Sequence, residues 1–216
     1  METNSLLEQR FQHYLSLPVI SEALRLLREK LPANLIFHSI EHTYDVMKEV
    51  LRFALEDGLA ERDIDMLVIA AAYHDLGFTQ RLTDNEAIGA QYARRAMENN
   101  GGFSAEEIIC VEKMIKDTRM IEDNNGPHQV ASIALSKYLL DADLSNLGRE
   151  DFFDRLQAMM FESQRPLVCV LKSMEKLLSR HQWWTAAAQK LRSAGLQKNL
   201  NTLRKRIARE EAGKSC

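Results

Sequence analysis

Apolar residues recur along this chain at spacings of three and four, which is the period of an amphipathic α-helix. The spacing predicts one helix over residues 20–31 and another over residues 40–56. Residues 62–75 differ, because 66–72 would be apolar on every side of a helix, which predicts a central buried element. The same reasoning predicts further helices over 4–16, 84–99, 104–117, 129–141, 149–162, 166–179, 183–194 and 197–211.

Proline and glycine are sparse and mark the ends of the predicted helices. Pro18 and Pro32 interrupt the first two helices, and Gly58 and Gly77 stop the two that follow. Residues 118–127 form the one clear long loop and end in the turn-forming sequence DNNGP. Long loops inside compact helical domains are often functional, so we interpret this one as a candidate lid.

The composition narrows the fold class. Nine Gly and four Pro among 216 residues are too few for the many tight turns of an all-β sandwich. The length and a hydrophobic content of 45% suffice for one sizeable buried core. We therefore expect an all-α helical bundle that forms a single domain.

The charge balance argues against a nucleic-acid-binding protein. The chain has 28 basic and 31 acidic residues, a formal net charge of −3, which gives no global attraction for a polyanion. A basic stretch does lie near the C-terminus, from Lys198 to Arg209, but leucines at helical spacing accompany it. We interpret it as an amphipathic helix with a solvated polar face.

The lack of a predicted targeting signal and the pattern of cysteines favour a cytoplasmic protein. Charged residues lie close to the start of the chain, and the most apolar uncharged run, 66–73, is far shorter than the roughly 20 residues of a membrane span. No signal peptide or membrane interaction is predicted. The three cysteines, Cys110, Cys169 and Cys216, are odd in number and widely spaced, so we expect free thiols in a reducing compartment.

The pair His74-Asp75 follows directly on the most apolar helix. An ionised carboxylate at the end of a buried helix is costly to desolvate unless a cation or hydrogen-bond donors compensate it. A bound metal ion is one compensation. The alternative, open on this dipeptide alone, is that Asp75 caps a neighbouring helix and His74 is a hydrogen-bonded core histidine.

Three short motifs together resemble the HD-domain superfamily of metal-dependent phosphohydrolases. They are FHSIEHT at 37–43, AYHDLG at 72–77 and LDADLSNLG at 140–148, in the order and spacing of that family. The resemblance covers about residues 35–150, and HQWWT at 181–185 with Asn199 and Leu200 is similar to the C-terminal helices of small stand-alone members. It implies an HD-type domain over 35–216, preceded by a helical extension over 1–34 that packs on the core.

The resemblance implies four metal ligands, His42, His74, Asp75 and Asp143. Helical residues two apart point about 200° from each other, so Asp141 and Asp143 cannot both face one ion. Asp143 matches the position of the family's closing ligand, and Asp141 is the alternative. Two imidazoles and two carboxylates suit one divalent ion, Mn, Fe, Ni, Co, Zn or Mg, without selecting among them.

The chain departs from the family's two-metal members. Between the His-Asp pair and Asp143 only His128 could supply a further imidazole, which favours a mononuclear site over a di-iron oxygenase or a two-metal phosphodiesterase. Glu86 stands where such members often place ligands. Its role is open among a weak second ligand, a general acid or base, and a solvated glutamate at a helix start. The acidic pair of alarmone hydrolases is absent, since LGFT occupies 76–79.

The expected reaction is hydrolysis of a phosphate ester of a small molecule such as a nucleotide. A divalent ion would lower the pKa of its water from about 15.7 towards 7–9, and Asp75 would orient that water. His38 would lie close by or contact the phosphate. Three cations could balance its charge: Arg81, Lys116 and Arg119.

The sequence disfavours one further assignment and leaves two others open. The string HSIEH at 38–42 matches an HxxEH metalloprotease signature, but such an enzyme would leave the His74-Asp75 pair without a role. A regulatory HD domain that binds a nucleotide or metal without turnover is the main alternative. The resemblance also leaves homodimerisation open.

Overall fold

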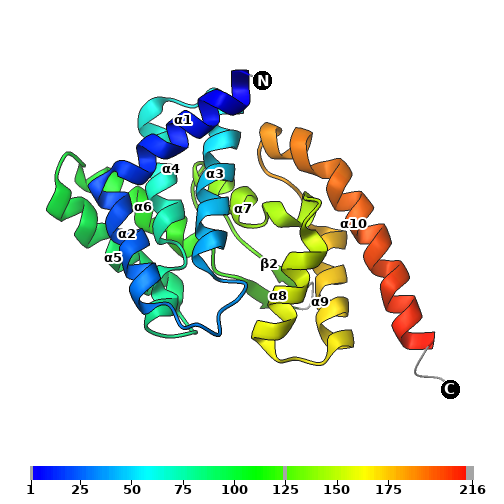
Figure 1. Cartoon of the computed structure of the whole chain (residues 1–216). Helices are drawn as coiled ribbons and strands as arrows, with labels where there is room; N and C mark the ends of the chain where they lie inside the picture. The colour runs from blue at the N-terminus through cyan, green and yellow to red at the C-terminus, as the bar shows by residue number, and fades with distance from the viewer. Residues whose placement is uncertain (1, 124–125, 213–216) are drawn as a thin grey trace.

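The helical periodicity is realised along most of the described residues. The computed structural model describes residues 2–123 and 126–212. Short 3-10 helices follow two of the α-helices, η1 (Leu76–Thr79) and η2 (Ser145–Gly148). The α-helices within the described ranges are α1 (Glu2–Ser16), α2 (Pro18–Lys30), α3 (Ile40–Glu56), α4 (Glu61–Tyr73), α5 (Asn85–Asn100), α6 (Ala105–Asp117), α7 (Ser136–Asp143), α8 (Phe152–Ser163), α9 (Leu167–Arg180) and α10 (Ala186–Ala212) (Figure 1). The predicted all-α fold is confirmed.

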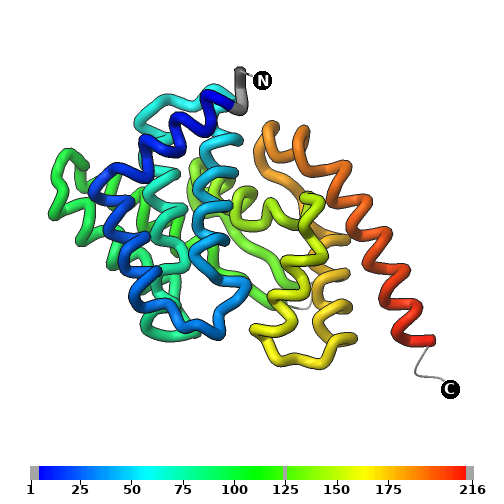
Figure 2. Tube along the Cα trace, viewed as in Figure 1, coloured from blue at the N-terminus to red at the C-terminus, as the bar shows by residue number. Residues whose placement is uncertain are grey.

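The helices form two groups joined through the middle of the molecule. Figures 1 and 2 show α1, α2, α4, α5 and α6 on one side and α8, α9 and α10 on the other, with α3 and α7 between them. Helix α3 packs against both α4 and α7, and α10 packs along η2 and α9. The two helices that begin and end the predicted metal motif, α3 and α7, are therefore direct neighbours.

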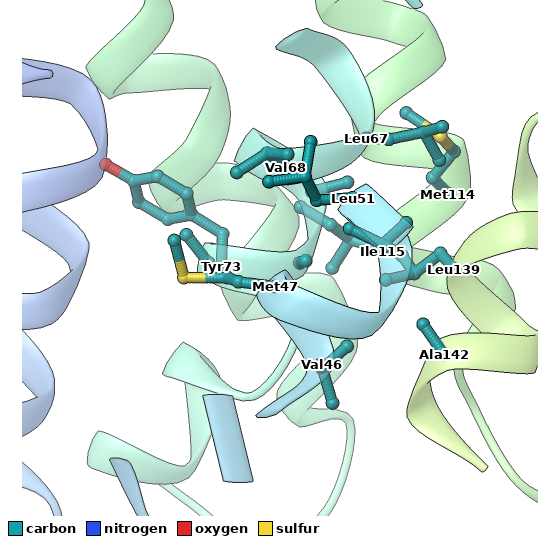
Figure 3. Packing of buried hydrophobic residues seen from close by; sticks show 14 of the residues in the cluster. Val46, Met47, Leu51, Leu67, Val68, Tyr73, Met114, Ile115, Leu139 and Ala142 are labelled. Atoms are coloured by element: carbon teal, nitrogen blue, oxygen red, sulfur yellow. The ribbon is translucent and has the colours of Figure 1, made fainter. Parts of the chain in front are cut away.

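Helix α4 is the central buried element that its sequence predicts. Every residue from Met66 to Tyr73 is at most 7% exposed. Its neighbours are α3 and α6, whose Leu51 and Ile115 pack against it in the core (Figure 3). The one polar group on Tyr73 is satisfied, because its hydroxyl donates to the carbonyl of Val19 at 2.6 Å. The end of this helix lies deep in the protein, so His74 and Asp75, which follow it, are also buried.

Two predicted helix boundaries were wrong. The helix predicted over 129–141 exists only as α7, because 129–135 runs as irregular backbone. The two helices predicted over 183–194 and 197–211 are one continuous helix, α10, with Gly195 in its interior. A Cβ built on Gly195 would lie 1.9 Å from the carbonyl oxygen of Gly148, so this glycine permits a close helix approach rather than ending a helix.

The predicted long loop over 118–127 is largely a hairpin. Strands β1 (Ile121–Asp123) and β2 (Gly126–His128) pair antiparallel, with Ile121 opposite His128. Asn124 and Asn125, which belong to the predicted lid, lie outside the described residues. The hairpin borders the pocket described below, and its action as a lid stays a prediction.

The first two helices are part of the same core as the rest. Phe11, Ile20 and Leu24 are buried in one cluster with residues of α3 and α4. The division into an extension over 1–34 and a domain over 35–216 stays a prediction. Within the described ranges, no helix combines the length and apolarity that a membrane span requires. Cys110 and Cys169 are free thiols, and Cys216 lies outside the described residues.

Candidate metal centre

Local structure places His42 in the first turn of α3. Ser39 caps this helix, and its hydroxyl accepts a hydrogen bond from the backbone N–H of His42 at 3.4 Å. The His74-Asp75 pair continues α4: His74 keeps helical backbone angles, and Asp75 begins the turn into η1. His42, His74 and Asp75 are all less than 9% exposed. Two buried helix ends therefore bring three polar side chains into the interior.

The ligand atoms of these three residues converge on one point. His42, His74 and Asp75 each offer an atom within 4.8 Å of the other two. Nε2 of His74 lies 3.4 Å from Nε2 of His42 and 3.1 Å from Oδ2 of Asp75. Nε2 of His42 lies 3.5 Å from the same carboxylate oxygen. Such short separations between ligand atoms are expected when several side chains can bind the same ion.

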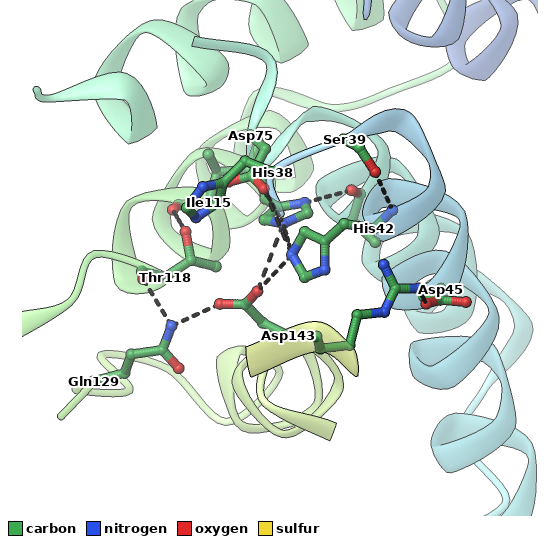
Figure 4. Close-up of polar contacts among 12 residues, drawn as sticks. His38, Ser39, His42, Asp45, Asp75, Ile115, Thr118, Gln129 and Asp143 are labelled. Atoms are coloured by element: carbon green, nitrogen blue, oxygen red, sulfur yellow. Dashed lines mark hydrogen bonds and ion pairs between the residues drawn. The ribbon is translucent and has the colours of Figure 1, made fainter. Parts of the chain in front are cut away.

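Asp143, at the end of α7, completes the group, and α7 packs against α3 (Figure 4). Its Oδ1 lies 3.2 Å from Nε2 of His42 and 3.6 Å from Nε2 of His74. Its Oδ2 accepts a hydrogen bond of 2.7 Å from the side-chain amide of Gln129, which also donates to the carbonyl of Thr118. Gln129 thus turns one oxygen of Asp143 away from the imidazoles and leaves the other facing them.

The residues fit a divalent cation. Oδ2 of Asp75 is buried and makes no hydrogen bond of acceptable geometry, which is unfavourable for a carboxylate unless a cation binds it. His74 donates from Nδ1 to the carbonyl of Ala71 at 2.7 Å, and this fixes the tautomer that leaves Nε2 free as a ligand. Two imidazole nitrogens and two carboxylate oxygens form a donor set that such ions accept.

The electrostatics of the group favour positive charge at its centre. Burial opposes ionisation of His74, but the nearby charges of Asp75 and Asp143 outweigh it and raise the pKa of His74 to about 9. Burial likewise opposes ionisation of Asp75, and the surrounding imidazoles hold the pKa of its carboxyl well below its usual range. The two carboxylates therefore stabilise a cation here, whether it is a proton or a metal ion.

Asp141 faces a different part of the protein. Its carboxylate accepts hydrogen bonds from the backbone N–H groups of Trp184 and Thr185 at 2.8 to 3.1 Å and from the Thr185 hydroxyl at 2.8 Å. Trp184 and Thr185 lead into the first turn of α10. The Thr185 hydroxyl also accepts a hydrogen bond from the backbone N–H of Ala188 in that turn. Asp141 therefore ties α7 to the start of α10, while Asp143 faces the imidazoles.

His38 lies beside the group and is held by Glu162 of α8. One oxygen of Glu162 accepts the backbone N–H groups of Phe37 and His38 at 2.9 and 3.1 Å, and the other contacts Nδ1 of His38. The His38 ring stacks on Phe78, with centroids 4.5 Å apart. Burial opposes ionisation of His38, but the contact with Glu162 and the charges of Asp75 and Asp143 together outweigh it and raise the pKa of His38. This histidine is a well-positioned hydrogen-bond donor.

A pocket of about 560 Å³ opens beside these residues. His38, Asp75, Glu86, Arg119 and Asp143 all line it. Glu86 is half-buried, and burial raises the pKa of its carboxyl. Arg119 is exposed and lies 3.3 Å from Asp84.

The other two predicted phosphate-binding cations do not line this pocket. Arg81 lies 3.8 Å from Asp84 on the surface, and Lys116 is exposed on α6.

Sequence reasoning missed Gln129 and Glu162. Gln129 lies just after the hairpin, 14 residues before Asp143, and Glu162 lies near the end of α8, 124 residues after His38. Neither belongs to a motif with a recognisable spacing.

A solved structure has the same arrangement of helices. No family model matches the chain, and no curated protein matches it either. A crystal structure of a predicted HD superfamily hydrolase from an uncultured Thermotogales bacterium superposes with a TM-score of 0.60. The match covers 94% of this chain and 97% of that chain at 20% sequence identity.

The chain has the HD-type fold. The resemblance inferred from the three short motifs is thereby confirmed at the level of the fold. In this HD-type fold the described residues bring His42, His74 and Asp75 together as a group that could hold a metal ion.

Proposed function

We propose that this protein is a metal-dependent phosphohydrolase that cleaves a phosphate ester of a small molecule with water. The observation that supports this most strongly is the convergence of His42, His74, Asp75 and Asp143, of which the two aspartates line a pocket large enough for a metabolite. A buried carboxylate oxygen without a hydrogen bond points to a cation, and the pocket beside it gives a substrate access.

His42, His74, Asp75 and Asp143 would hold one divalent ion. Such an ion, when bound, polarises a phosphoryl oxygen and lowers the pKa of a coordinated water molecule. The imidazoles contribute through Nε2, and the two carboxylates supply negative charge that balances the ion. Gln129 keeps Asp143 in place by holding its second oxygen.

The residues around the ion would carry the proton transfers. Asp75 accepts a hydrogen bond from the attacking water and orients it, while the ring of His38 donates to a phosphoryl oxygen. The water oxygen forms a bond to phosphorus as the bond from phosphorus to the ester oxygen breaks. Asp75 takes the proton that the water gives up, and the electron pair of the broken bond stays on the departing alcohol. Glu86, a half-buried carboxyl that lines the same pocket, supplies the proton that the alcohol needs and is reprotonated from solvent.

A phosphatase screen tests this function. Phosphomonoesters and cyclic nucleotides are assayed with Mn²⁺, Ni²⁺, Co²⁺ and Mg²⁺, using the wild type, Asp75→Ala and the control Glu150→Gln at an exposed carboxylate outside the pocket. Hydrolysis by the wild type and the control, lost in Asp75→Ala, is the expected result. A protein that binds metal and hydrolyses nothing across the panel would instead be a regulatory HD domain.

A further inference from the structure

One side of the pocket beside the metal centre is an apolar wall. Phe37 and Phe78 contribute aromatic rings from the segments that precede α3 and follow α4. Val170, Met174 and Leu177 of α9 lie on one face of that helix, since they are spaced by four and three residues, and all are less than 9% exposed. This wall is preformed by the core, because the same three side chains belong to the main hydrophobic cluster.

The apolar character extends to the mouth of the pocket. Leu82 and Met120 both line it, yet they are 63% and 40% exposed. Large apolar side chains that line a pocket and still face solvent commonly mark a binding surface. Met159 of α8 adds a flexible thioether to the lining, which suits an apolar ligand of variable shape.

The charged lining does not favour a highly anionic ligand. Two guanidinium groups, Arg119 and Arg165, line the pocket, and Arg119 is already close to Asp84. A divalent ion and a protonated His38 would still leave the lining without net positive charge. With Glu86 protonated, as the proposed reaction needs, the carboxylates that oppose them are Asp75, Asp84, Glu122, Asp143 and Glu162. A triphosphate or a bisphosphate would need more cations than this lining offers.

We propose that the substrate carries a single phosphoryl group on an apolar, uncharged body. The phosphoryl group would lie at the metal centre and the body against Phe37, Phe78 and the α9 face. The inference rests on the proposed function for the phosphoryl chemistry, and it adds the class of the alcohol that leaves. Nucleoside polyphosphates are disfavoured for two reasons. The carboxylates of the lining would repel their negative charge, and their polar sugars would be desolvated against an apolar wall.

The first test compares esters with similar leaving groups. The specificity constant kcat/KM is measured with Mn²⁺ for n-hexyl phosphate, glycerol 1-phosphate and ATP. Burial of the hexyl chain should favour n-hexyl phosphate over glycerol 1-phosphate by about tenfold or more, and ATP should be the poorest of the three. Hydrolysis with glycerol 1-phosphate or ATP preferred would overturn the inference and leave the proposed function standing.

A pair of adjacent methionines provides matched variants. Met159 lines the pocket and Met160 does not, although both are half-buried on α8. Met159→Gln should lower kcat/KM for n-hexyl phosphate several-fold and leave glycerol 1-phosphate unchanged, and Met160→Gln should change neither. Equal effects of the two variants on n-hexyl phosphate would contradict the assignment of the wall.

Binding measured without turnover separates this inference from the proposed function. Calorimetry of the Mn²⁺-loaded protein compares n-hexylphosphonate with methylphosphonate, neither of which has an ester bond to cleave. Binding of the hexyl compound at least about tenfold tighter, weakened by Met159→Gln, supports the apolar subsite even if no ester is hydrolysed. Equal affinity for the two phosphonates would overturn the inference.

Discussion

Glu162 holds His38 by its backbone and its ring at once: one carboxylate oxygen accepts the His38 N–H and the other contacts Nδ1. The two residues are 124 positions apart, so helix α8 fixes the segment that enters α3. His38 and Glu162 both line the pocket. The pair therefore sets how an imidazole faces the bound substrate.

Glu162→Gln should weaken catalysis without removing metal. The neutral amide cannot stabilise a charged imidazole, so the raised pKa of His38 should fall, and kcat should drop by about tenfold or more. NMR titration of the imidazole in Mg²⁺-loaded protein measures the pKa, and elemental analysis measures the metal. Glu150→Gln, at an exposed carboxylate, is the control. An unchanged His38 pKa in Glu162→Gln would contradict this role.

Substitution of Asp141 should affect stability, whereas substitution of Asp143 should affect metal binding. Asp141→Ala removes the acceptor of the Trp184 and Thr185 N–H groups, so it should lower the free energy of unfolding by about 1–3 kcal/mol while the metal content stays unchanged. Asp143→Ala should abolish metal binding, because it removes one of the four proposed ligands. Urea unfolding and elemental analysis of both variants check this. Metal loss in Asp141→Ala, with full retention in Asp143→Ala, would reverse the assignment.

His181 should make the protein sensitive to acid. Burial lowers the pKa of His181 to about 4 from an ordinary 6.5, so the unfolded chain binds this proton more readily than the folded protein. The contribution of neutral His181 to stability is complete above pH 6.5 and is lost as the pH falls towards 4, by up to about 3 kcal/mol. The ring packs against Trp183 at 4.2 Å, so His181→Phe keeps the packing and removes the titration.

Unfolding free energies at pH 7, 5.5 and 4.5 measure this effect. Stability of the wild type should fall more steeply with acid than that of His181→Phe. His13→Phe, made at an exposed position, controls for the loss of a histidine in general. Parallel pH dependence of the wild type and His181→Phe would show that His181 does not contribute.

Gly195→Ala should destabilise the protein, against the usual preference of helices. Alanine in a helix interior is ordinarily favoured over glycine by about 1 kcal/mol. Here the added Cβ would meet the Gly148 carbonyl at 1.9 Å and force α10 away from η2, which should cost about 1–3 kcal/mol. Urea unfolding measures the sign directly, and a more stable variant would contradict the close packing.

The fold could be predicted from the sequence where local signals decide. Apolar spacing and the proline at position 18 place α2, and the uninterrupted apolar run of α4 marks the buried centre. Gly195 shows where such signals fail, because a glycine inside a helix and a glycine that ends one look alike without the neighbour. The irregular backbone over 129–135 likewise depends on tertiary contacts, among them the bonds of Gln129 to Thr118 and Asp143.

The candidate ligands could be found from the sequence, and their supporting residues could not. His42, His74, Asp75 and Asp143 lie in short motifs with characteristic spacing, so the resemblance identified them together. Phosphate-binding cations are harder, because any surface arginine or lysine is equally plausible from sequence. Arg119 lines the pocket, whereas Arg81 and Lys116 do not. Glu162 and Gln129 act through contacts that exist only after folding.

The central claim is that His42, His74, Asp75 and Asp143 hold one divalent ion, and elemental analysis tests it most directly. The wild type and Asp75→Ala are purified without added metal, and circular dichroism confirms that both are folded. The account predicts about one transition-metal ion per wild-type chain and none in Asp75→Ala. A folded Asp75→Ala variant that keeps the full metal content of the wild type would contradict it.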